Sequence, residues 1–317
     1  MNRLGLTVAA ILSAVAAVPL QVAAWNAPTH MVTGAIAYRI LENESPRTVS
    51  VIKTLLEKHP WYADRWRDDV EKLPESQRGE MLFMLAARWA DDIRMQAKLQ
   101  REVKWHYINF PLKPAGEPED IKPLAPHPDN ILSALAENRR IVKSQVSADK
   151  RAIALAWLFH LVGDVHQPLH TVQLFTREYP HGDRGGNEVC IRLAPGRAPL
   201  DLHRLWDGLI TSTNNVGRLR NIAMEVLSKF SRVGLGELDQ KLPDVWAKES
   251  YEIAVKIAYE NGNLRGTPKG QARDCRDVPD ADFISRGYPG IAKLIADRRV
   301  YLAGYRMAEL LERITGE

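Results

Sequence analysis

The segment from Asp149 to about Gly163 is nearly all apolar after its first three residues, and it ends beside side chains that can bind metal. A run of this length predicts a helix, and a helix that is apolar on every side belongs at the centre of a domain. His160 and Asp164 are four residues apart, so their side chains leave the same face of that helix. Burying Asp164 there without a cation would cost several kcal/mol. The segment therefore predicts a central helix beside a bound metal ion.

The same histidine-to-aspartate spacing occurs again at His203 and Asp207, and His170 lies between the two pairs. Neutral imidazole and carboxylate together form a ligand set typical of zinc. One such pair is common by chance. Two pairs with an additional histidine favour a metal site over scattered surface or core histidines.

The remaining sequence predicts mostly helices. Ser45 followed by Pro46 is typical of a helix start, and Ser147 is a candidate N-cap for the apolar helix. Further helices are expected over residues 129–144, 217–233, 243–261 and 289–314. Six prolines from Pro111 to Pro128 predict a loop. A short strand is expected over residues 188–193. No repeat or linker divides the chain, which predicts one all-α domain with a few short strands.

The first 24 residues have the pattern of a secretory signal peptide. Arg3 precedes an uncharged run from Leu4 to Leu20, and small residues at 22–24 suit a signal peptidase. A membrane anchor is the weaker reading, because the run is short and interrupted by Pro19. No later stretch approaches the length of a membrane span. We therefore expect a mature domain over residues 25–317, exported to the periplasm or the medium.

Composition narrows the functional classes. Hydrophobic residues make up 45% of the chain and charged residues 26%, as in soluble globular proteins. The net charge of +4 permits an anionic partner, but no block of like charge indicates a nucleic-acid-binding tail. Two cysteines exclude a disulfide scaffold and a Cys-rich zinc finger. In an oxidising compartment Cys190 and Cys275 are expected to form a disulfide, although the sequence does not prove their pairing.

Several short motifs, in this order and spacing, resemble those of the S1/P1 nuclease family, which comprises secreted, mainly helical, three-zinc enzymes that cut single-stranded nucleic acid. The resemblance covers nearly the whole mature chain. The motifs are Trp25 with His30, Trp89-Ala-Asp91-Asp-Ile-Arg94, Trp105-His106-Tyr107-Ile-Asn109-Phe-Pro111, the run from His160 to His170, Asp183-Arg-Gly185-Gly186-Asn187, Leu202-His203-Arg-Leu-Trp206-Asp207 and Trp246-Ala-Lys-Glu249-Ser250.

The resemblance implies three zinc sites. The ligands of the first site would be Asp91, His106, His160 and Asp164, and those of the second His170, His203 and Asp207. The third site would use His30, the α-amino and carbonyl groups of Trp25, and Asp164 as a carboxylate shared with the first site. The terminal amine of Trp25 can chelate only after signal-peptide cleavage. Three zinc ions would outweigh the carboxylates of Asp91, Asp164 and Asp207 and leave a net charge of about +3, which would attract a phosphodiester.

The implied reaction is hydrolysis of single-stranded DNA and RNA to 5′-phosphate products, with 3′-nucleotidase activity. Zinc lowers the pKa of its bound water to about 7, so hydroxide is available near neutral pH. Asp164 would bridge two metals and orient the nucleophile. The resemblance places Arg94 at the phosphate, where a forked guanidinium fits; a surface salt bridge is the alternative. We expect a monomer without an obligate protein partner.

The resemblance also implies substrate contacts. Tyr107 would stack on a base, although a packed core tyrosine is nearly as well supported. Asn109 departs from the fungal pattern, which has aspartate there, so base preference stays open. Asp183 and Asn187 are expected in a loop beside the site, in a supporting role.

The remaining histidines are not expected to be ligands. His166 faces away from His160 on an ideal helix, which predicts a buried supporting group. His59, His127 and His181 adjoin prolines or helix ends and are expected to be exposed.

Two alternatives to the nuclease remain. A zinc phospholipase C would share the fold and the ligand types, but the Trp-Ala-Asp-x-x-Arg and Asp-x-Gly-Gly-Asn patterns favour the nuclease. A binding protein held together by structural zinc is disfavoured, because structural sites are usually closed by four ligands and Cys-rich, whereas the second site here has three protein ligands.

Overall fold

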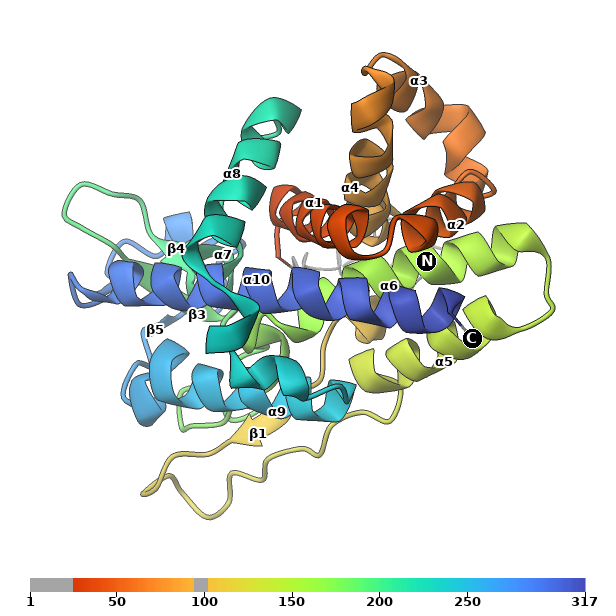
Figure 1. The fold of residues 1–317 in the computed structure, drawn as a ribbon. Coiled ribbons are helices and arrows are strands. Elements are labelled where there is room, and N and C mark those ends of the chain that lie inside the picture. Colours follow the sequence, from red (N-terminus) through yellow and green to blue (C-terminus); the bar gives the residue numbers. More distant parts are fainter. Residues whose placement is uncertain (1–24, 94–101, 317) are drawn as a thin grey trace, which may run out of the picture.

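The computed structural model describes residues 25–93 and 102–316, and these form a mainly helical fold with a few short strands, as predicted (Figure 1). The helices are α1 (Ala27–Glu44), α2 (Pro46–Leu56), α3 (Arg67–Glu71), α4 (Glu75–Ile93), α5 (Ile131–Lys143), α6 (Ala148–Val165), α7 (Leu202–Asp207), α8 (Val216–Lys229), α9 (Pro243–Ile253) and α10 (Tyr288–Thr315). The strands are β1 (Phe110–Leu112), β2 (Val172–Leu174), β3 (Val189–Arg192), β4 (Leu200–Asp201), β5 (Thr267–Pro268) and β6 (Asp282–Phe283).

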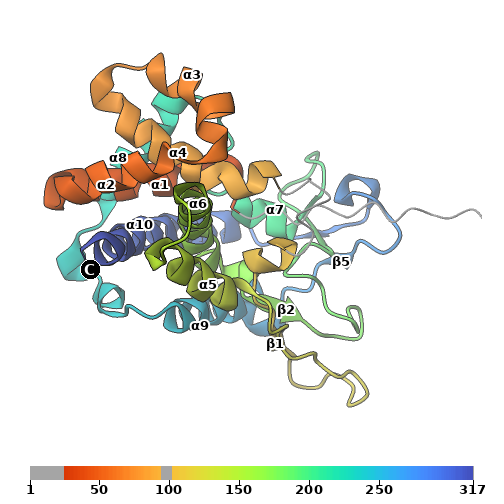
Figure 2. The same cartoon turned by 90° about the vertical axis from the view of Figure 1, so that its right-hand side faces the viewer.

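Helix α6 is the central helix that the apolar segment predicts. Every residue from Ala154 to Val165 is buried, and α6 packs against α4 and α5 while also contacting α2, α9 and α10. Figures 1 and 2 show it enclosed by these helices. Beyond its exposed first turn, a helix surrounded in this way has no solvent face, which explains why its sequence shows no polar stripe there.

Helices α1 and α4 were not among the predicted elements, and both are needed for the site. Helix α1 packs against α4, α8 and α10, so it too is buried on most sides and lacks a clear polar face. A Cβ atom on Gly34 would lie only 2.6 Å from the carbonyl oxygen of Phe83, so glycine permits the close approach of α1 and α4. This approach brings the side chains of His30 and Asp91 to the same region of the molecule.

Several predicted boundaries are confirmed. Ser45 is the N-cap residue of α2 with Pro46 in the first turn, Ser147 is the N-cap residue of α6, and β3 falls within the predicted strand. The predicted helix over 217–233 ends earlier, at Lys229. The helix expected over 243–261 is α9 followed by a π-helical turn at Ala254–Ala258 and a 3₁₀ turn at Glu260–Gly262.

The strands bring distant segments together around the helical body. β1 pairs in parallel with β2, in the register Phe110 to Val172, so the chain after His106 runs beside the chain after His170. A second small sheet has the order β4-β3-β5, with β6 also paired to β3, and lies at the opposite end of the molecule from the C-terminus (Figure 1). A disulfide joins Cys190 of this sheet to Cys275, which confirms the expected pairing.

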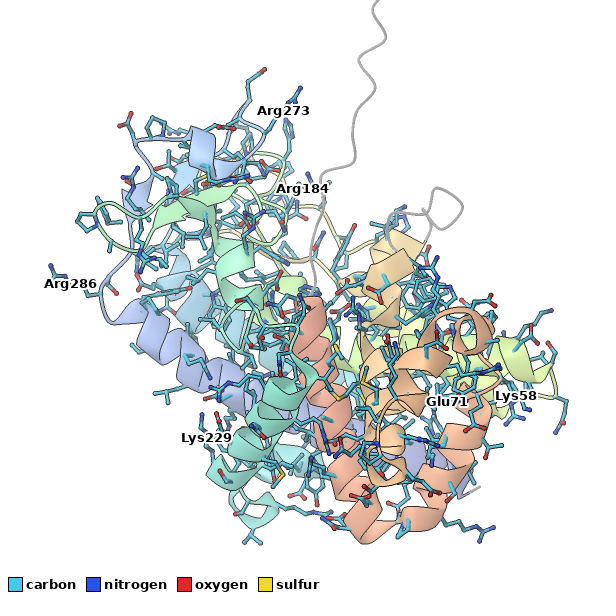
Figure 3. All side chains as sticks on the ribbon, turned by 90° about the horizontal axis from the view of Figure 1, so that it is seen from above. Lys58, Glu71, Arg184, Lys229, Arg273 and Arg286 are labelled. Atoms are coloured by element: carbon cyan, nitrogen blue, oxygen red, sulfur yellow. A yellow bond between two sulfur atoms is a disulfide. The ribbon has the colours of Figure 1, made fainter. Side chains whose placement is uncertain are left out.

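Charged side chains project from several parts of the surface of this fold. Figure 3 shows the exposed side chains of Lys58, Glu71, Arg184, Lys229, Arg273 and Arg286 projecting outward from the ribbon. Within the two described ranges, no helix combines the length and apolar character that crossing a bilayer requires.

Candidate metal centre

Eight histidine and aspartate side chains from separate segments meet beside α6. Their ligand atoms form three groups, each with all atoms within 4.8 Å of one another: His30, Asp91 and His160; His106, His160 and Asp164; His170, His203 and Asp207. The groups adjoin one another, because His160 belongs to two of them and Asp164 also lies 3.6 Å from Nδ1 of His170. The structure thus brings together every side chain that the resemblance assigns to a metal, apart from the terminal group of Trp25.

Asp164 is the junction of the cluster. Its Oδ2 lies 2.9 Å from Nδ1 of His106 and 3.0 Å from Nε2 of His160, and its Oδ1 lies 3.2 Å from Nε2 of His30. The carboxylate is fully buried. Burial alone would raise its pKa, but the surrounding histidines, His160 foremost, hold the pKa well below its ordinary value. Asp164 is therefore an ionised group that faces several imidazoles at once.

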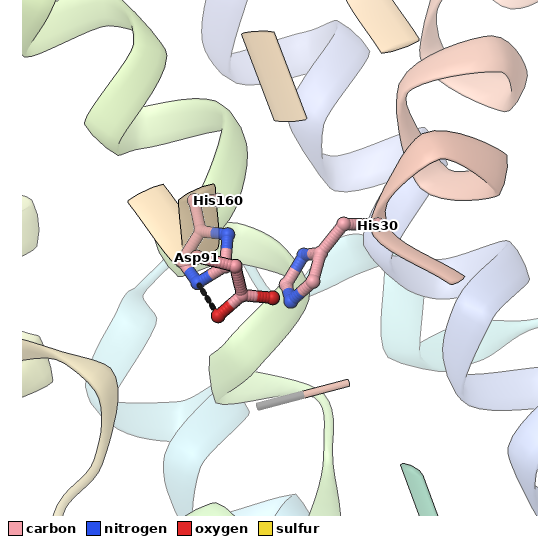
Figure 4. Close-up of side chains that lie close together, drawn as sticks. All are labelled: His30, Asp91 and His160. Carbon is pink, nitrogen blue, oxygen red and sulfur yellow. Dashed lines mark ion pairs between the residues drawn. The ribbon is translucent and has the colours of Figure 1, made fainter. Parts of the chain in front are cut away.

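His30, Asp91 and His160 converge from α1, α4 and α6 (Figure 4). The imidazole rings of His30 and His160 are stacked with centroids 3.9 Å apart, and Asp91 Oδ1 lies 3.8 Å from Nε2 of His160. Burial lowers the pKa of His30. Burial opposes a charge on His160 as well, but the carboxylates of Asp164 and Asp91 raise its pKa. A Cβ on Gly163 would lie 2.7 Å from Nδ1 of His30, so glycine makes room for the His30 ring.

Backbone carbonyls orient three of the imidazoles. Nδ1 of His160 donates to Ala87 O at 2.9 Å, Nδ1 of His170 to His106 O at 2.7 Å, and Nδ1 of His203 to Gly185 O at 2.6 Å. A neutral imidazole that donates from Nδ1 keeps its lone pair on Nε2. This is the protonation state that a metal ligand needs, and such outer hydrogen bonds are typical of metal sites.

Asp207 supplies the carboxylate of the third group. Its Oδ1 accepts a 2.8 Å hydrogen bond from Nε2 of Gln167, while its Oδ2, which has no hydrogen-bond partner among the described residues, lies 3.6 Å from Nε2 of His203. Burial raises the pKa of Asp207 well above its ordinary value, and the bond from Gln167 counteracts this only in part. A buried carboxylate oxygen beside two histidines fits a divalent cation better than it fits an empty apolar site. The donor set is therefore able to bind metal ions.

The glycine-containing loop lies beside this group, as expected. The carboxylate of Asp183 accepts hydrogen bonds from the backbone nitrogens of Leu174, Gly185 and Gly186 and from the hydroxyl of Tyr259. Burial raises the pKa of Asp183 to about 6. Gly185 has a φ of +62°, and a Cβ there would collide with the carbonyl oxygen of Leu169. The loop thereby fixes the carbonyl that orients His203.

The predicted substrate residues are only partly described. Tyr107 and Asn109 lie one and three residues after the cluster residue His106, and both are half-buried. Arg94 lies outside the described residues. Trp25 lies two residues before the start of α1 and five before His30, and its side chain is fully buried.

The prediction for His59 was wrong. His127 and His181 are exposed, but His59 is only 2% exposed because its ring stacks on Trp66 at 4.5 Å and meets the edge of Trp89 at 4.7 Å. His166 is fully buried, as predicted. Its Nδ1 donates to Val162 O and its Nε2 accepts from Arg306.

The groups that hold the end of α6 were not predicted from the sequence. Arg299 and Arg306 of α10 are buried, and both donate to the carboxylate of Glu249 on α9, at 2.9 Å and 2.7 Å. Arg299 also donates to His166 O at 3.1 Å, two residues after Asp164. The available signal was a pair of arginines seven residues apart, hence on one helix face, that enclose the uncharged run from Val300 to Tyr305.

Comparison with known proteins gives one consistent result. Residues 25–316 match the model of the S1/P1 nuclease family. Endonuclease 5 of Arabidopsis thaliana is 27% identical over 269 residues, which cover 76% of this chain and 80% of the relative. Endonuclease 4 of the same plant is 25% identical over 313 residues, which cover 92% of this chain and 89% of the relative. The match spans the whole described fold and its metal-binding cluster, and the chain therefore belongs to the S1/P1 nuclease family.

Proposed function

We propose that this endonuclease uses three zinc ions to hydrolyse single-stranded DNA and RNA, leaves 5′-phosphate ends, and also acts as a 3′-nucleotidase. The observation that carries the proposal is the buried cluster joined by Asp164, in which eight histidine and aspartate side chains face one another. So many ligands exceed what one ion can use, since zinc in proteins is usually four-coordinate.

The described residues suggest how the ions would be held. Asp91, His106, His160 and Asp164 would hold the first zinc, and His170, His203 and Asp207 the second. His30, Asp164 and the terminal amine and carbonyl of Trp25 would hold the third. Zinc held there would supply hydroxide near neutral pH and polarise the phosphate oxygens.

The chain's own residues would then position the substrate. Asp164, which lies within 3.2 Å of three imidazoles, would accept a hydrogen bond from the attacking water and so orient it. Arg94 would clamp the phosphate with its guanidinium. Tyr107 would stack on an unpaired base, a contact that a base inside a duplex cannot make without unstacking. The amide of Asn109 can donate and accept, which suits several bases.

Export of the mature chain is part of the proposal. Residues 1–24 would be a signal peptide, and the mature domain would be residues 25–317, acting as a monomer in the periplasm or the medium. Three observations support this: the Cys190–Cys275 disulfide, the start of the family match at Trp25, and the burial of Trp25 just before α1. A disulfide is typical of an oxidising compartment.

The first test is chelator-sensitive cleavage. Zinc-loaded protein beginning at Trp25 would be incubated with a single-stranded oligonucleotide, with a duplex of the same sequence and with phosphatidylcholine, each with and without EDTA. We expect cleavage of the single strand that EDTA abolishes and zinc restores, and far slower cleavage of the duplex. A protein that binds zinc but hydrolyses only the phospholipid would contradict the proposal. The relatives, all of them endonucleases, give no support to that outcome.

A further inference from the structure

A cavity of about 490 Å³ lies next to the metal centre but is separate from it, and we call it the tryptophan pocket. It lies between the turn that follows α2 and helices α4, α5 and α6. Aliphatic side chains form part of its wall, and the residues that define its chemistry are His59, Trp61, Trp89, Trp105, Lys150 and Trp157. Its volume lies within the range of roughly 300–1,000 Å³ found for small-molecule sites.

The walls of the tryptophan pocket are indole rings set nearly at right angles. Trp89 meets Trp61 at 88° and Trp157 at 80°, with ring centroids 6.3 and 5.8 Å apart. Trp105 meets Trp157 at 71° and 5.0 Å. Perpendicular rings offer both faces and edges to a flat ligand, and stacking of one base on an aromatic side chain contributes about 1–3 kcal/mol.

The polar groups of the tryptophan pocket indicate which flat ligand would fit. Nε2 of His59 and Nε1 of Trp89 are buried and have no hydrogen-bond partner among the described residues. Nδ1 of His59 accepts from the backbone nitrogen of Trp61 at 3.1 Å, so in the neutral imidazole Nε2 carries the hydrogen. Both orphaned groups are therefore donors in the wall of the pocket, and leaving a buried donor unpaired costs about 1–3 kcal/mol. A ring with acceptor atoms would relieve this cost where a small side-chain shift lets it reach either nitrogen.

Charge narrows the choice further. No carboxylate is found among the described residues that line the tryptophan pocket, and the exposed Lys150 supplies one positive charge. A cationic ligand would face Lys150 without a counter-charge, so the aromatic walls do not form a cage for an ammonium group. A flat ligand with a negative charge is complementary to this lining.

We propose that the tryptophan pocket is a second ligand site, and that its ligand is a nucleoside 5′-monophosphate with its base among the indoles and its phosphate toward Lys150. The choice of a nucleotide rests on the proposed function, because cleavage at the metal centre would release such products next to this site. The two sites share a wall: the ring of Trp157 lies 5.6 Å from the ring of His106 and 6.4 Å from that of His160. Product in the tryptophan pocket therefore contacts residues that support the metal cluster.

The test measures binding apart from the metal centre. Zinc-loaded protein would be titrated with labelled adenosine 5′-monophosphate by equilibrium dialysis, with inorganic phosphate in excess so that phosphate occupies the metal centre. Val146→Phe narrows the pocket at a residue that is 41% exposed, and Lys150→Glu reverses its charge. Lys248→Glu, on the exposed side of α9 away from the pocket, is the matched control.

We expect one phosphate-resistant site in the wild type, an affinity lowered by about tenfold or more in Val146→Phe and Lys150→Glu, and an unchanged affinity in Lys248→Glu. Absence of a phosphate-resistant site, or equal affinity in all four proteins, overturns the proposal. Oligonucleotide cleavage by the same preparations separates the two claims. Pocket-dependent binding without cleavage would refute only the proposed function, and cleavage without pocket-dependent binding would refute only the second site.

Discussion

Gln167 Nε2 donates a 2.8 Å hydrogen bond to Asp207 Oδ1. The oxygen of the same amide accepts from the backbone nitrogen of Leu169 at 2.6 Å, at the start of the 3₁₀ turn Pro168–His170. The Gln167 side chain thus links the carboxylate of Asp207 on α7 to the turn that carries His170. Asp207 and His170 belong to one ligand group, which His203 completes.

Replacing Gln167 by glutamate keeps the acceptor for Leu169 but removes the donor to Asp207 and places a like charge opposite it. Loss of such outer contacts typically costs about 10–100-fold in metal affinity or activity. We expect a decrease of that size in kcat and in zinc retention against a competing chelator. Gln173→Glu on β2 is the control, because Gln173 donates to His181 O rather than to the cluster. Equal loss in both variants would show that Gln167 has no special role.

Asp164→Asn should abolish cleavage, with a decrease of more than about 10³-fold, because residues that act as a unit fail together when one is removed. The amide brings no negative charge to the three imidazoles that lie within 3.2 Å of the carboxylate. Cleavage rates, zinc content and the circular dichroism spectrum would be measured together.

Asp92→Asn is the matched control for Asp164→Asn, since Asp92 pairs with Arg88 at 2.7 Å on the surface of α4. It should keep nearly full activity. Near wild-type turnover in Asp164→Asn would refute the bridging role.

An N-terminal extension should remove one metal. If the α-amino group of Trp25 is a ligand, protein with extra residues before Trp25 will hold about one zinc ion fewer than protein that begins at Trp25, because an amide nitrogen does not replace an amine as a ligand. Metal content per chain would be measured by mass spectrometry, and the same extension placed after Glu317 is the control. Identical zinc content in all three forms would exclude Trp25 as a ligand.

His59 should make stability depend on pH. Burial lowers its pKa from 6.5 to about 4, so between these values the unfolded chain binds a proton that the folded protein does not. The contribution of neutral His59 to the free energy of unfolding is therefore fully present above pH 6.5. It is lost progressively as the pH falls toward 4, by up to roughly 2–3 kcal/mol.

His59→Asn retains an acceptor for Trp61 N but does not titrate, so the pH dependence of the free energy of unfolding should be shallower in this variant between pH 6.5 and 4. Urea denaturation at several pH values would measure it. His181→Asn removes an exposed imidazole for comparison. Parallel pH profiles for wild type and His59→Asn would contradict the expectation.

Local sequence patterns by themselves determine several helices of this protein and the residues of its site. The apolar segment ending in His160 and Asp164 specifies α6 and the common side of these two ligand candidates, because helical spacing alone places residues four apart on one side. Ser45, Pro46 and Ser147 mark helix starts through the backbone geometry of single residues. The ordered motifs indicated the family and the side chains that the structure brings together at the cluster.

Only the tertiary structure decided how those side chains are held. The carbonyls of Ala87, His106 and Gly185 orient imidazoles far away in the sequence, and Gln167 reaches Asp207 across forty residues. His59 is buried because the rings of Trp66 and Trp89 cover it, and α1 shows no amphipathic pattern because neighbours surround it. Spacing fixes what one helix presents, whereas burial and hydrogen-bond partners depend on which segments pack together, and no local pattern contains that information.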